Sequence, residues 1–303
     1  DGAYSAMVRI AWGGSFTEGT SYQVFRGTTA NSASAVLIGS VIDQTWFDDL
    51  TAIRGRVYYY WVRAQNAFGT SAAAGPDEGH SRGVQYDFDA DGRADMAIYS
   101  RSTDRWYAVN PSAQILAWNM PGVATNPASA ILTPADYDGD GRTDMGVYQP
   151  ESGAWFAKSL ASGATLLSGA LWGGGDAIPV PADYDGDGRA DLAVFFPSMA
   201  TWYILAYSGE IHVLPWGTAN MTPVPADFDG DGKADLGLFD PDQAKWYVMS
   251  LSGQVLVWGL HWGWPGAILV PADYNGDNRC DFGVRDATTG RWYIISITGA
   301  VIA

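Results

Sequence analysis

The chain has 303 residues, of which 47% are hydrophobic and 14% aromatic, so it can bury the core of one large or two ordinary domains. Its formal net charge of −16 argues against nucleic acid as a partner, because phosphate binding requires a concentrated basic surface. The single cysteine excludes an intramolecular disulfide, and no stretch approaches the roughly 20 apolar residues that span a membrane.

Residues 1–80 have the alternating apolar pattern of half-buried β-strands. The alternating positions are Val8, Ile10, Trp12, Tyr22, Val24, Tyr58, Tyr60, Val62 and Ala64. The run from Tyr58 to Asn66 resembles the sixth strand of a fibronectin type III domain, in which Tyr58 would be the corner tyrosine and Trp12 the core tryptophan. We therefore expect a β-sandwich over residues 1–80, a linker at Ala74–Gly83, and a second domain over residues 81–303.

The second domain contains five versions of one Asp-rich nonamer, which we call loops 1 to 5. They begin at Asp87, Asp136, Asp183, Asp227 and Asp273, and loop 3 reads DYDGDGRAD. The starts lie 44 to 49 residues apart, and in every repeat a tryptophan follows the first Asp by 19 residues. Repetition at this period indicates a repeat architecture.

Each loop is expected to join strands A and B of a four-stranded sheet A to D. In the third repeat an apolar segment, Val180–Ala182, precedes the loop and a strand at Leu192–Phe196 follows it. Four short strands in about 46 residues match one propeller blade. The predicted fold class is therefore all-β, a fibronectin type III-like sandwich followed by a β-propeller of five four-stranded repeats, closed with five blades or part of a larger ring. The tryptophans that open strand C are expected in the core: Trp106, Trp155, Trp202, Trp246 and Trp292.

The composition of the loops indicates bound calcium. Ca²⁺ takes six to eight oxygen ligands, and carboxylates at positions 1, 3 and 5 converge when glycine at position 6 lets the chain turn sharply. The carbonyl of position 7 and the Asp of position 9 would complete the ligand set. Nineteen of the 33 acidic residues lie in these loops and would repel one another without a cation. About five Ca²⁺ ions would reduce the net charge from −16 to −6.

The predicted ligands at positions 1, 3, 5, 7 and 9 are Asp87, Asp89, Asp91, Arg93 and Asp95 in loop 1; Asp136, Asp138, Asp140, Arg142 and Asp144 in loop 2; Asp183, Asp185, Asp187, Arg189 and Asp191 in loop 3; Asp227, Asp229, Asp231, Lys233 and Asp235 in loop 4; and Asp273, Asn275, Asp277, Arg279 and Asp281 in loop 5. Position 7 contributes only its backbone carbonyl, and its basic side chain would offset acidic charge.

Loop 5 departs from the pattern. Asn275 replaces the Asp of position 3, which keeps an oxygen but loses a charge, and Asn278 replaces the glycine of position 6, where Asn tolerates left-handed backbone. We therefore predict that loop 5 is the weakest site. Cys280, at position 8, is expected to be a small buried residue and not a nucleophile.

The five loops resemble the FG-GAP or VCBS repeats of integrin α-subunit propellers and of many bacterial surface proteins. The resemblance covers about residues 82–303. It implies a propeller with calcium in the A–B loops, on the face opposite the usual ligand face. Integrin propellers have seven blades, whereas this chain has five repeats.

The connections from strand D to the next strand A vary in length and are rich in tryptophan. Trp172, Trp216 and Trp262 each precede the next loop by 11 residues, and the fourth connection adds His261 and Trp264. Exposed tryptophans offer flat apolar faces on which sugar rings stack, so these five residues are candidate ligand-binding residues. Alternatively, they fill gaps between blades.

The predicted function is that of a secreted extracellular or cell-surface protein, stabilised by calcium, that binds carbohydrate or an extracellular protein through the D–A face. The first alternative is a structural subunit of a calcium-dependent extracellular assembly, such as a surface layer or fibre, which would self-associate. The second is a polysaccharide lyase or another glycan-active enzyme. No catalytic residue is assigned, because the histidines lack metalloprotease spacing and no nucleophile elbow is present.

Overall fold

The computed structural model describes residues 7–14, 19–53, 56–79 and 86–303, without the side chains of residues 118, 119 and 121. Strands dominate this part of the chain, and its helical segments are two 3₁₀ turns, Ser32–Ser34 (η1) and Pro197–Met199 (η2). No helix within these ranges is long and apolar enough to cross a membrane. Contacts divide the chain into two compact units, Asp1–Gly83 (unit 1) and Val84–Ala303 (unit 2), whereas the sequence placed the boundary at residues 80 and 81, outside the described residues.

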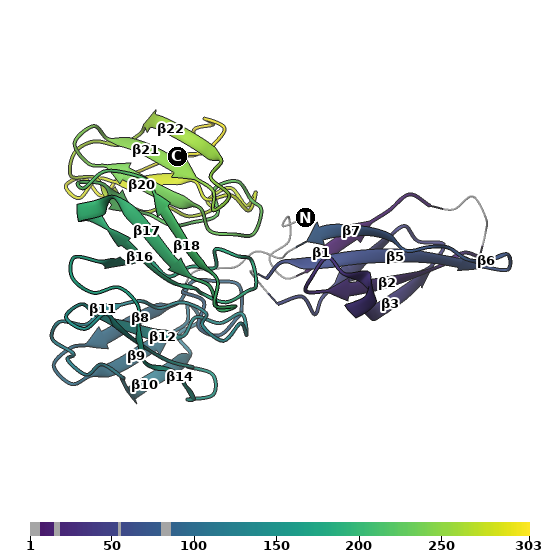
Figure 1. Cartoon of the computed structure of the whole chain (residues 1–303), viewed down its shortest axis with the longest axis horizontal. Coiled ribbons are helices and arrows are strands. Elements are labelled where there is room, and N and C mark those ends of the chain that lie inside the picture. Colours follow the sequence, from purple (N-terminus) through teal and green to yellow (C-terminus); the bar gives the residue numbers. More distant parts are fainter. Residues whose placement is uncertain (1–6, 15–18, 54–55, 80–85) are drawn as a thin grey trace. The chain divides into compact units, whose positions relative to one another are not determined.

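Unit 1 contains two antiparallel sheets (Figure 1). The smaller sheet pairs β1 (Val8–Ala11) with β4 (Trp46–Asp49). The larger has the order β3-β2-β5-β6, with β7 also paired to β5. Its strands are β2 (Ser21–Gly27), β3 (Val36–Ile42), β5 (Tyr58–Asn66), β6 (Gly69–Thr70) and β7 (Ala74–Gly79). Alternate apolar side chains of both sheets share one core, as the sequence pattern predicted: Val8, Ile10, Val24, Tyr58 and Tyr60.

The expected linker at Ala74–Gly83 was wrong over its first six residues. Ala74–Gly79 forms β7 and pairs with β5 from Tyr58 to Val62. The composition was misleading because proline and glycine are tolerated in a strand at the edge of a sheet, where Pro76 lies. The rest of the expected linker, residues 80–83, is outside the described residues.

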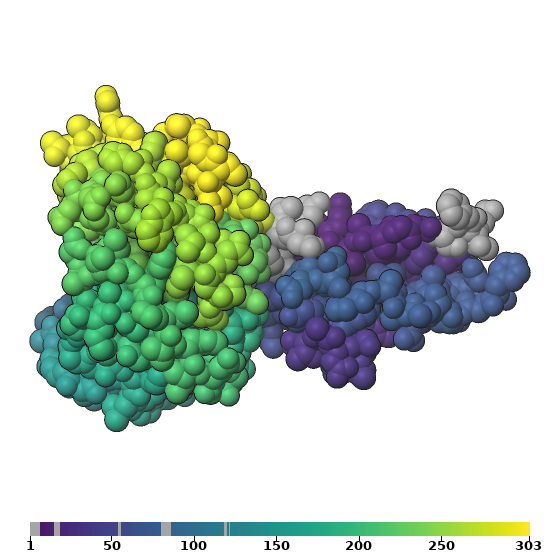
Figure 2. All heavy atoms as spheres, turned by 45° about the horizontal axis from the view of Figure 1, so that its top comes forward, coloured from purple at the N-terminus to yellow at the C-terminus, as the bar shows by residue number. Residues whose placement is uncertain are grey.

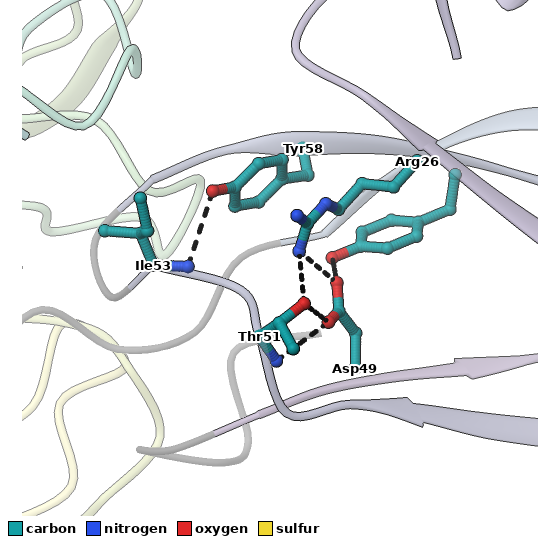
Figure 3. Close-up of polar contacts among 6 residues, drawn as sticks. Arg26, Asp49, Thr51, Ile53 and Tyr58 are labelled. Atoms are coloured by element: carbon teal, nitrogen blue, oxygen red, sulfur yellow. Dashed lines mark hydrogen bonds and ion pairs between the residues drawn. The ribbon is translucent and has the colours of Figure 1, made fainter. Parts of the chain in front are cut away.

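A buried carboxylate organises one end of the unit 1 core. Asp49 accepts hydrogen bonds from Arg26 at 2.7 Å, from Tyr60 at 3.0 Å, and from both the N–H and the hydroxyl of Thr51 (Figure 3). Burial disfavours the charged carboxylate, but the hydrogen bonds from Thr51 and Arg26 and the charge of Arg26 outweigh it, so the pKa of Asp49 is lowered. Beside this cluster, the Ile53 N–H donates to the Tyr58 hydroxyl at 3.4 Å.

Unit 2 is propeller-like and consists of antiparallel sheets that follow one another in chain order, here sheets 1 to 5 (Figure 1). Sheets 2, 3 and 4 have four strands, and sheets 1 and 5 have three. Sheet 1 contains β8 (Met96–Ser100), β9 (Arg105–Val109) and β10 (Ile115–Pro121); sheet 2 contains β11 (Ile131–Leu132), β12 (Met145–Gln149), β13 (Ala154–Lys158) and β14 (Thr165–Leu171). Sheet 3 contains β15 (Ile178–Pro179), β16 (Leu192–Phe196), β17 (Thr201–Leu205) and β18 (Ile211–Pro215); sheet 4 contains β19 (Thr222–Pro223), β20 (Leu236–Asp240), β21 (Lys245–Met249) and β22 (Val255–His261). Sheet 5 contains β23 (Ile268–Leu269), β24 (Phe282–Arg285) and β25 (Trp292–Ile295).

Strands B and C lie where the sequence placed them, whereas the A strands differ from the prediction. The predicted strand Leu192–Phe196 is β16, and strand C begins within one residue of its tryptophan in every sheet. The predicted A strand Val180–Ala182 is instead the two-residue β15, followed by a single bridge between Ala182 and Asp191. Pro181 contributes to this interruption because it has no N–H to donate.

Consecutive sheets pack through apolar clusters that join sheets 1 and 2, 2 and 3, 3 and 4, and 4 and 5. In each, strand B of one sheet lies against aromatic residues of the preceding sheet: the ring of Phe282 is 5.0 Å from that of Phe228 and 5.1 Å from that of Trp246. Four of the five strand C tryptophans are buried, as predicted. The prediction that Trp292 is buried was wrong, because its side chain on sheet 5 is 47% exposed.

Candidate metal centres and an aromatic pocket

All five loops turn in the same way. The carboxylate of position 1 accepts the N–H of position 6 at 2.7 to 3.0 Å. The residue at position 6 has a φ between 65° and 85° in every loop. The left-handed conformation expected there, including at Asn278, is therefore confirmed. The sequence did not reveal that position 4 is also left-handed, with φ of 62° at Ala90 of loop 1 and glycine in loops 2 to 5.

Three carboxylates converge in each of loops 1 to 4. One oxygen from each of positions 1, 3 and 9 lies within 4.8 Å of the others, so each group could hold a metal ion. The groups are Asp87, Asp89 and Asp95; Asp136, Asp138 and Asp144; Asp183, Asp185 and Asp191; and Asp227, Asp229 and Asp235.

The predicted ligands at position 5 lie outside these groups. In loops 1 to 4 the carboxylate of position 5 accepts the N–H of position 7 at 2.9 Å. In loop 5, Asn275 donates to the carboxylate of Asp277 at 3.2 Å and accepts the Asp277 N–H at 2.8 Å. The structure therefore brings together positions 1, 3 and 9 and uses position 5 to hold the turn.

The Asp of position 9 carries the strongest indication of a bound cation. It is buried in every loop, and its Oδ2 accepts the N–H of position 2 at 2.7 to 2.9 Å. The Oδ1 atoms of Asp95 and Asp281 are buried without a hydrogen-bond partner in the described part of the chain. A buried carboxylate oxygen without a partner is costly, and a hard cation would satisfy it.

Burial also raises the pKa of the loop carboxyls. It raises the pKa of Asp136, Asp191 and Asp227 to about 7 and that of Asp144 and Asp235 to about 8. Backbone hydrogen bonds oppose this rise, and neighbouring carboxylates add to it. Because a carboxyl must lose its proton before it binds a metal, protons and cations compete for these loops near neutral pH.

Each loop is bonded to the next. The carbonyl of position 1 accepts the N–H of position 8 in the following loop, at 2.6 to 2.7 Å. The donor and acceptor pairs are Thr143 and Asp87, Ala190 and Asp136, Ala234 and Asp183, and Cys280 and Asp227. The loops are therefore part of the contact between consecutive sheets, and Cys280 is buried there as expected.

The position 7 arginines of loops 3 and 5 extend over the preceding loop. A Cβ on Gly139 of loop 2 would lie 2.9 Å from Cγ of Arg189, and a Cβ on Gly230 of loop 4 would lie 3.0 Å from Cγ of Arg279. Glycine at position 4 of loops 2 and 4 therefore leaves room for the next loop's arginine. This packing was not predicted, because the sequence gives no contact between loops.

The candidate ligand tryptophans connect neighbouring sheets. The indole N–H of Trp172 donates to the Tyr203 carbonyl of sheet 3, at 3.2 Å. Trp262 makes the equivalent bond to the strand C carbonyl of Tyr293 at 3.3 Å, whereas Trp216 donates to the carbonyl of Leu236 on strand B of sheet 4 at 2.9 Å. Among the other two candidates, His261 is exposed and Trp264 packs on Tyr293, with ring centroids 5.4 Å apart. The structure does not bring the five candidates into one site.

One candidate, Trp216, lines a pocket of about 470 Å³ that is formed by sheet 4 and the connection leading into it from sheet 3. Trp258 is 73% exposed, and its ring lies 5.9 Å from that of Trp216 and 5.3 Å from that of Tyr247. Acidic groups line the other part of the pocket. Asp242 accepts a hydrogen bond from Asn220 at 2.7 Å, and the buried Asp240 accepts the N–H groups of residues 242 and 243.

Sequence reasoning did not find Trp258, Tyr247, Asp240 or Asp242. The available signal was a tryptophan in strand D of the fourth repeat, opposite Tyr247 in the strand register. The equivalent positions opposite strand C in sheets 2 and 3 hold Ser168 and Val213. The aromatic pocket is therefore a feature of sheet 4 and the connection leading into it, and not of the repeat.

Comparisons with known proteins agree with the repeats. The FG-GAP-like repeat family matches residues 87–147 and 183–238, which contain loops 1 to 4, so the chain carries FG-GAP-like repeats. Loop 5, with its two asparagines, lies outside the matched residues. No curated protein matches the sequence significantly.

Several solved structures show distant likeness. One is a lectin from Agrocybe aegerita described as specific for non-reducing terminal N-acetylglucosamine, with 16% identity, a TM-score of 0.44, and coverage of 90% of this chain and 86% of the lectin. A second is a streptogramin B lyase, with 10% identity, a TM-score of 0.44, and coverage of 82% of this chain and 79% of the lyase. A third is a virginiamycin B lyase from Staphylococcus aureus, with 11% identity, a TM-score of 0.43, and coverage of 83% of this chain and 81% of the lyase. Likeness at this level gives no information about activity.

Proposed function

We propose that this protein is a calcium-stabilised extracellular binding module, composed of a fibronectin type III-like domain and a propeller of five FG-GAP-like repeats, that recognises neutral carbohydrate. The topology of unit 1 supports its assignment: β3, β2, β5 and β7 form one sheet, β1 and β4 the other, and Tyr58 contacts the backbone five residues upstream. Calcium would stabilise unit 2, and the pocket at Trp216 would bind the sugar.

Calcium is the cation that the donor set favours. The converging groups are carboxylate oxygens without nitrogen or sulfur ligands, which suits a hard cation, and the loops leave a buried carboxylate oxygen unpaired at Asp95 and Asp281. Magnesium is less suited, because it requires near-octahedral geometry and retains its waters. When bound, calcium would neutralise the carboxylates and hold positions 1, 3 and 9 together.

Titration calorimetry of the chelator-treated full chain, with calcium and separately with magnesium, tests this proposal. About five ions per chain are expected, with the weakest site in loop 5. Asn275→Asp restores the missing charge and should strengthen that site, whereas Asn66→Asp, an equal charge change in unit 1, should not. Heat and stoichiometry indistinguishable from a blank titration would reject calcium binding.

The pocket on sheet 4 supports a sugar as the ligand. The exposed face of Trp258, beside Trp216 and Tyr247, offers an apolar platform for the C–H face of a pyranose ring. Asp242 and Asn220 can accept and donate hydrogen bonds to hydroxyl groups at the platform's edge. Two carboxylates disfavour an anionic sugar, so we expect a neutral one.

Binding of neutral and acidic methyl pyranosides, followed by tryptophan fluorescence and calorimetry in calcium, tests the sugar site. Trp258→Ala should abolish binding without changing the fold, because the side chain is exposed. Phe68→Ala, which removes an exposed aromatic ring from unit 1, should leave binding intact. Equal binding by Trp258→Ala, or binding only of acidic sugars, would refute the proposed site. Release of an unsaturated product from a polysaccharide would instead support the lyase alternative.

A further inference from the structure

Sheets 1 and 5 each expose one apolar face that is buried in the other sheets. On β8, Met96 and Ile98 are 62% and 69% exposed, whereas the residues equivalent to Ile98 in sheets 2 to 5 are fully buried: Val147, Val194, Leu238 and Val284. On sheet 5, Trp292 is 47% and Tyr274 is 37% exposed, whereas their equivalents in sheets 1 to 4 are buried. The two sheets lie at opposite ends of unit 2 (Figures 1 and 2), so these faces do not cover each other.

The two exposed faces are the two halves of one repeated contact. Between sheets 4 and 5, Phe282 at the start of strand B packs on Phe228 and Trp246. Met96 has the place of Phe282, and Tyr274 and Trp292 have the places of Phe228 and Trp246. Methionine packs well on aromatic rings, as Met145 does in the cluster of sheets 1 and 2.

The loops at these ends are complementary as well. Gly139 and Gly230 are covered by the position 7 arginine of the following loop, whereas a Cβ on Gly276 of loop 5 would meet no atom within 4 Å. Arg93, at position 7 of loop 1, is exposed. Ala94, at position 8, is also exposed, whereas its equivalents Thr143, Ala234 and Cys280 are buried.

We propose that the exposed face of sheet 5 binds the exposed face of sheet 1 in a second copy of this chain. In this head-to-tail contact, Met96 and Ile98 of one copy pack on Tyr274 and Trp292 of the other, and Arg93 lies over Gly276. A second copy is the occupant that the structure favours, because its sheet 1 carries the strand B side chains and the loop arginine that this face receives elsewhere. The inference is independent of the sugar pocket.

A heterologous contact of this kind leaves one free face of each kind at the two ends of a row of copies, so further copies can add until the row closes into a ring or extends as a filament. Light scattering of the full chain in calcium should therefore give a mass that rises with protein concentration. Ile98→Asp and Trp292→Asp each remove one face, and each should be monomeric alone. Mixed in equal amounts, the two variants retain one compatible pair of faces and should form a dimer of twice the monomer mass and nothing larger. Leu171→Asp, an equally exposed apolar residue on sheet 2, should assemble like the unaltered chain.

The substituted side chains are exposed, so thermal melting should show folded variants. An unaltered chain that is monomeric at every concentration would overturn the proposal. This is also the result expected if sheets 1 and 5 of one chain pack on each other in solution. Assembly that persists in both variants, or a mixture that stays monomeric, would also overturn it. Calcium and sugar binding by monomeric variants would leave the proposed function intact in each case.

Discussion

At the residue scale, Ala90 is the residue of loop 1 whose backbone conformation conflicts with its side chain. It has a φ of 62° at position 4, where the other loops have glycine. A left-handed conformation costs an L-residue roughly 1–2 kcal/mol, and the greater freedom of glycine in the unfolded chain cancels about half of the gain. Ala90→Gly should therefore increase the free energy of unfolding by about 0.5–1 kcal/mol, as measured by denaturant titration.

Ala94 in the same loop is the matched control. It is exposed and does not have a positive φ, so Ala94→Gly gains nothing from relieved strain and should lower stability. The two variants make the same chemical change four residues apart, and opposite signs are expected. Equal losses of stability would mean that the conformation of Ala90 is not strained in the folded chain.

At the element scale, the sequence predicted the strands and turns that recur in every repeat. The turn at position 6 and strands B and C follow from glycine, aspartate and tryptophan at constant spacing, and they lie where expected. The exposure of Trp292 could not be predicted, because the repeat that buries Trp246 is identical in pattern, and burial depends on the neighbouring sheet. The pocket at Trp258 was missed for a related reason: it combines side chains of three strands of sheet 4 with the connection that precedes it, and the periodicity of one strand does not show which strands and connections meet.

The loops also predict an unusual dependence of stability on pH. In the unfolded chain an aspartate has its ordinary pKa of 3.8, whereas burial raises the pKa of Asp136 and Asp144 in the folded loop to about 7 and about 8. Between these values the folded state binds more protons, so the free energy of unfolding falls as pH rises. In EDTA, the melting temperature should therefore decrease from about pH 5 to pH 8.

Saturating calcium should reverse this trend, because the ions replace the protons and bind more tightly as the carboxyls ionise. The increase in melting temperature that calcium causes should be larger at about pH 8 than at about pH 5. Asp49 of unit 1 does not interfere, since its lowered pKa affects stability only as pH falls below about 3.8. A melting temperature in EDTA that rises with pH over this range would contradict the buried, partly protonated loops.

At the scale of the whole molecule, calcium should act on one unit. Unit 1 contains none of the Asp nonamers, whereas in unit 2 each loop is bonded to the next through the position 1 carbonyl. Loosening one loop therefore weakens the contact between two sheets, and unit 2 should unfold as a single cooperative unit. Scanning calorimetry should show two transitions, of which only one depends on calcium.

The size of the calcium effect follows from mass action. A site at a hundredfold excess of calcium over its Kd contributes about 2.7 kcal/mol, and each kcal/mol moves the melting temperature of a domain this large by about 2–4 °C. Asp138→Asn keeps the oxygen that accepts the Asp140 N–H but removes a charge from the loop 2 group. It should therefore reduce the calcium-dependent shift of the unit 2 transition while leaving that transition nearly unchanged in EDTA. A shift of both transitions by EDTA, or a large loss of stability by Asp138→Asn in EDTA, would show that the loops do not act through a bound ion in unit 2.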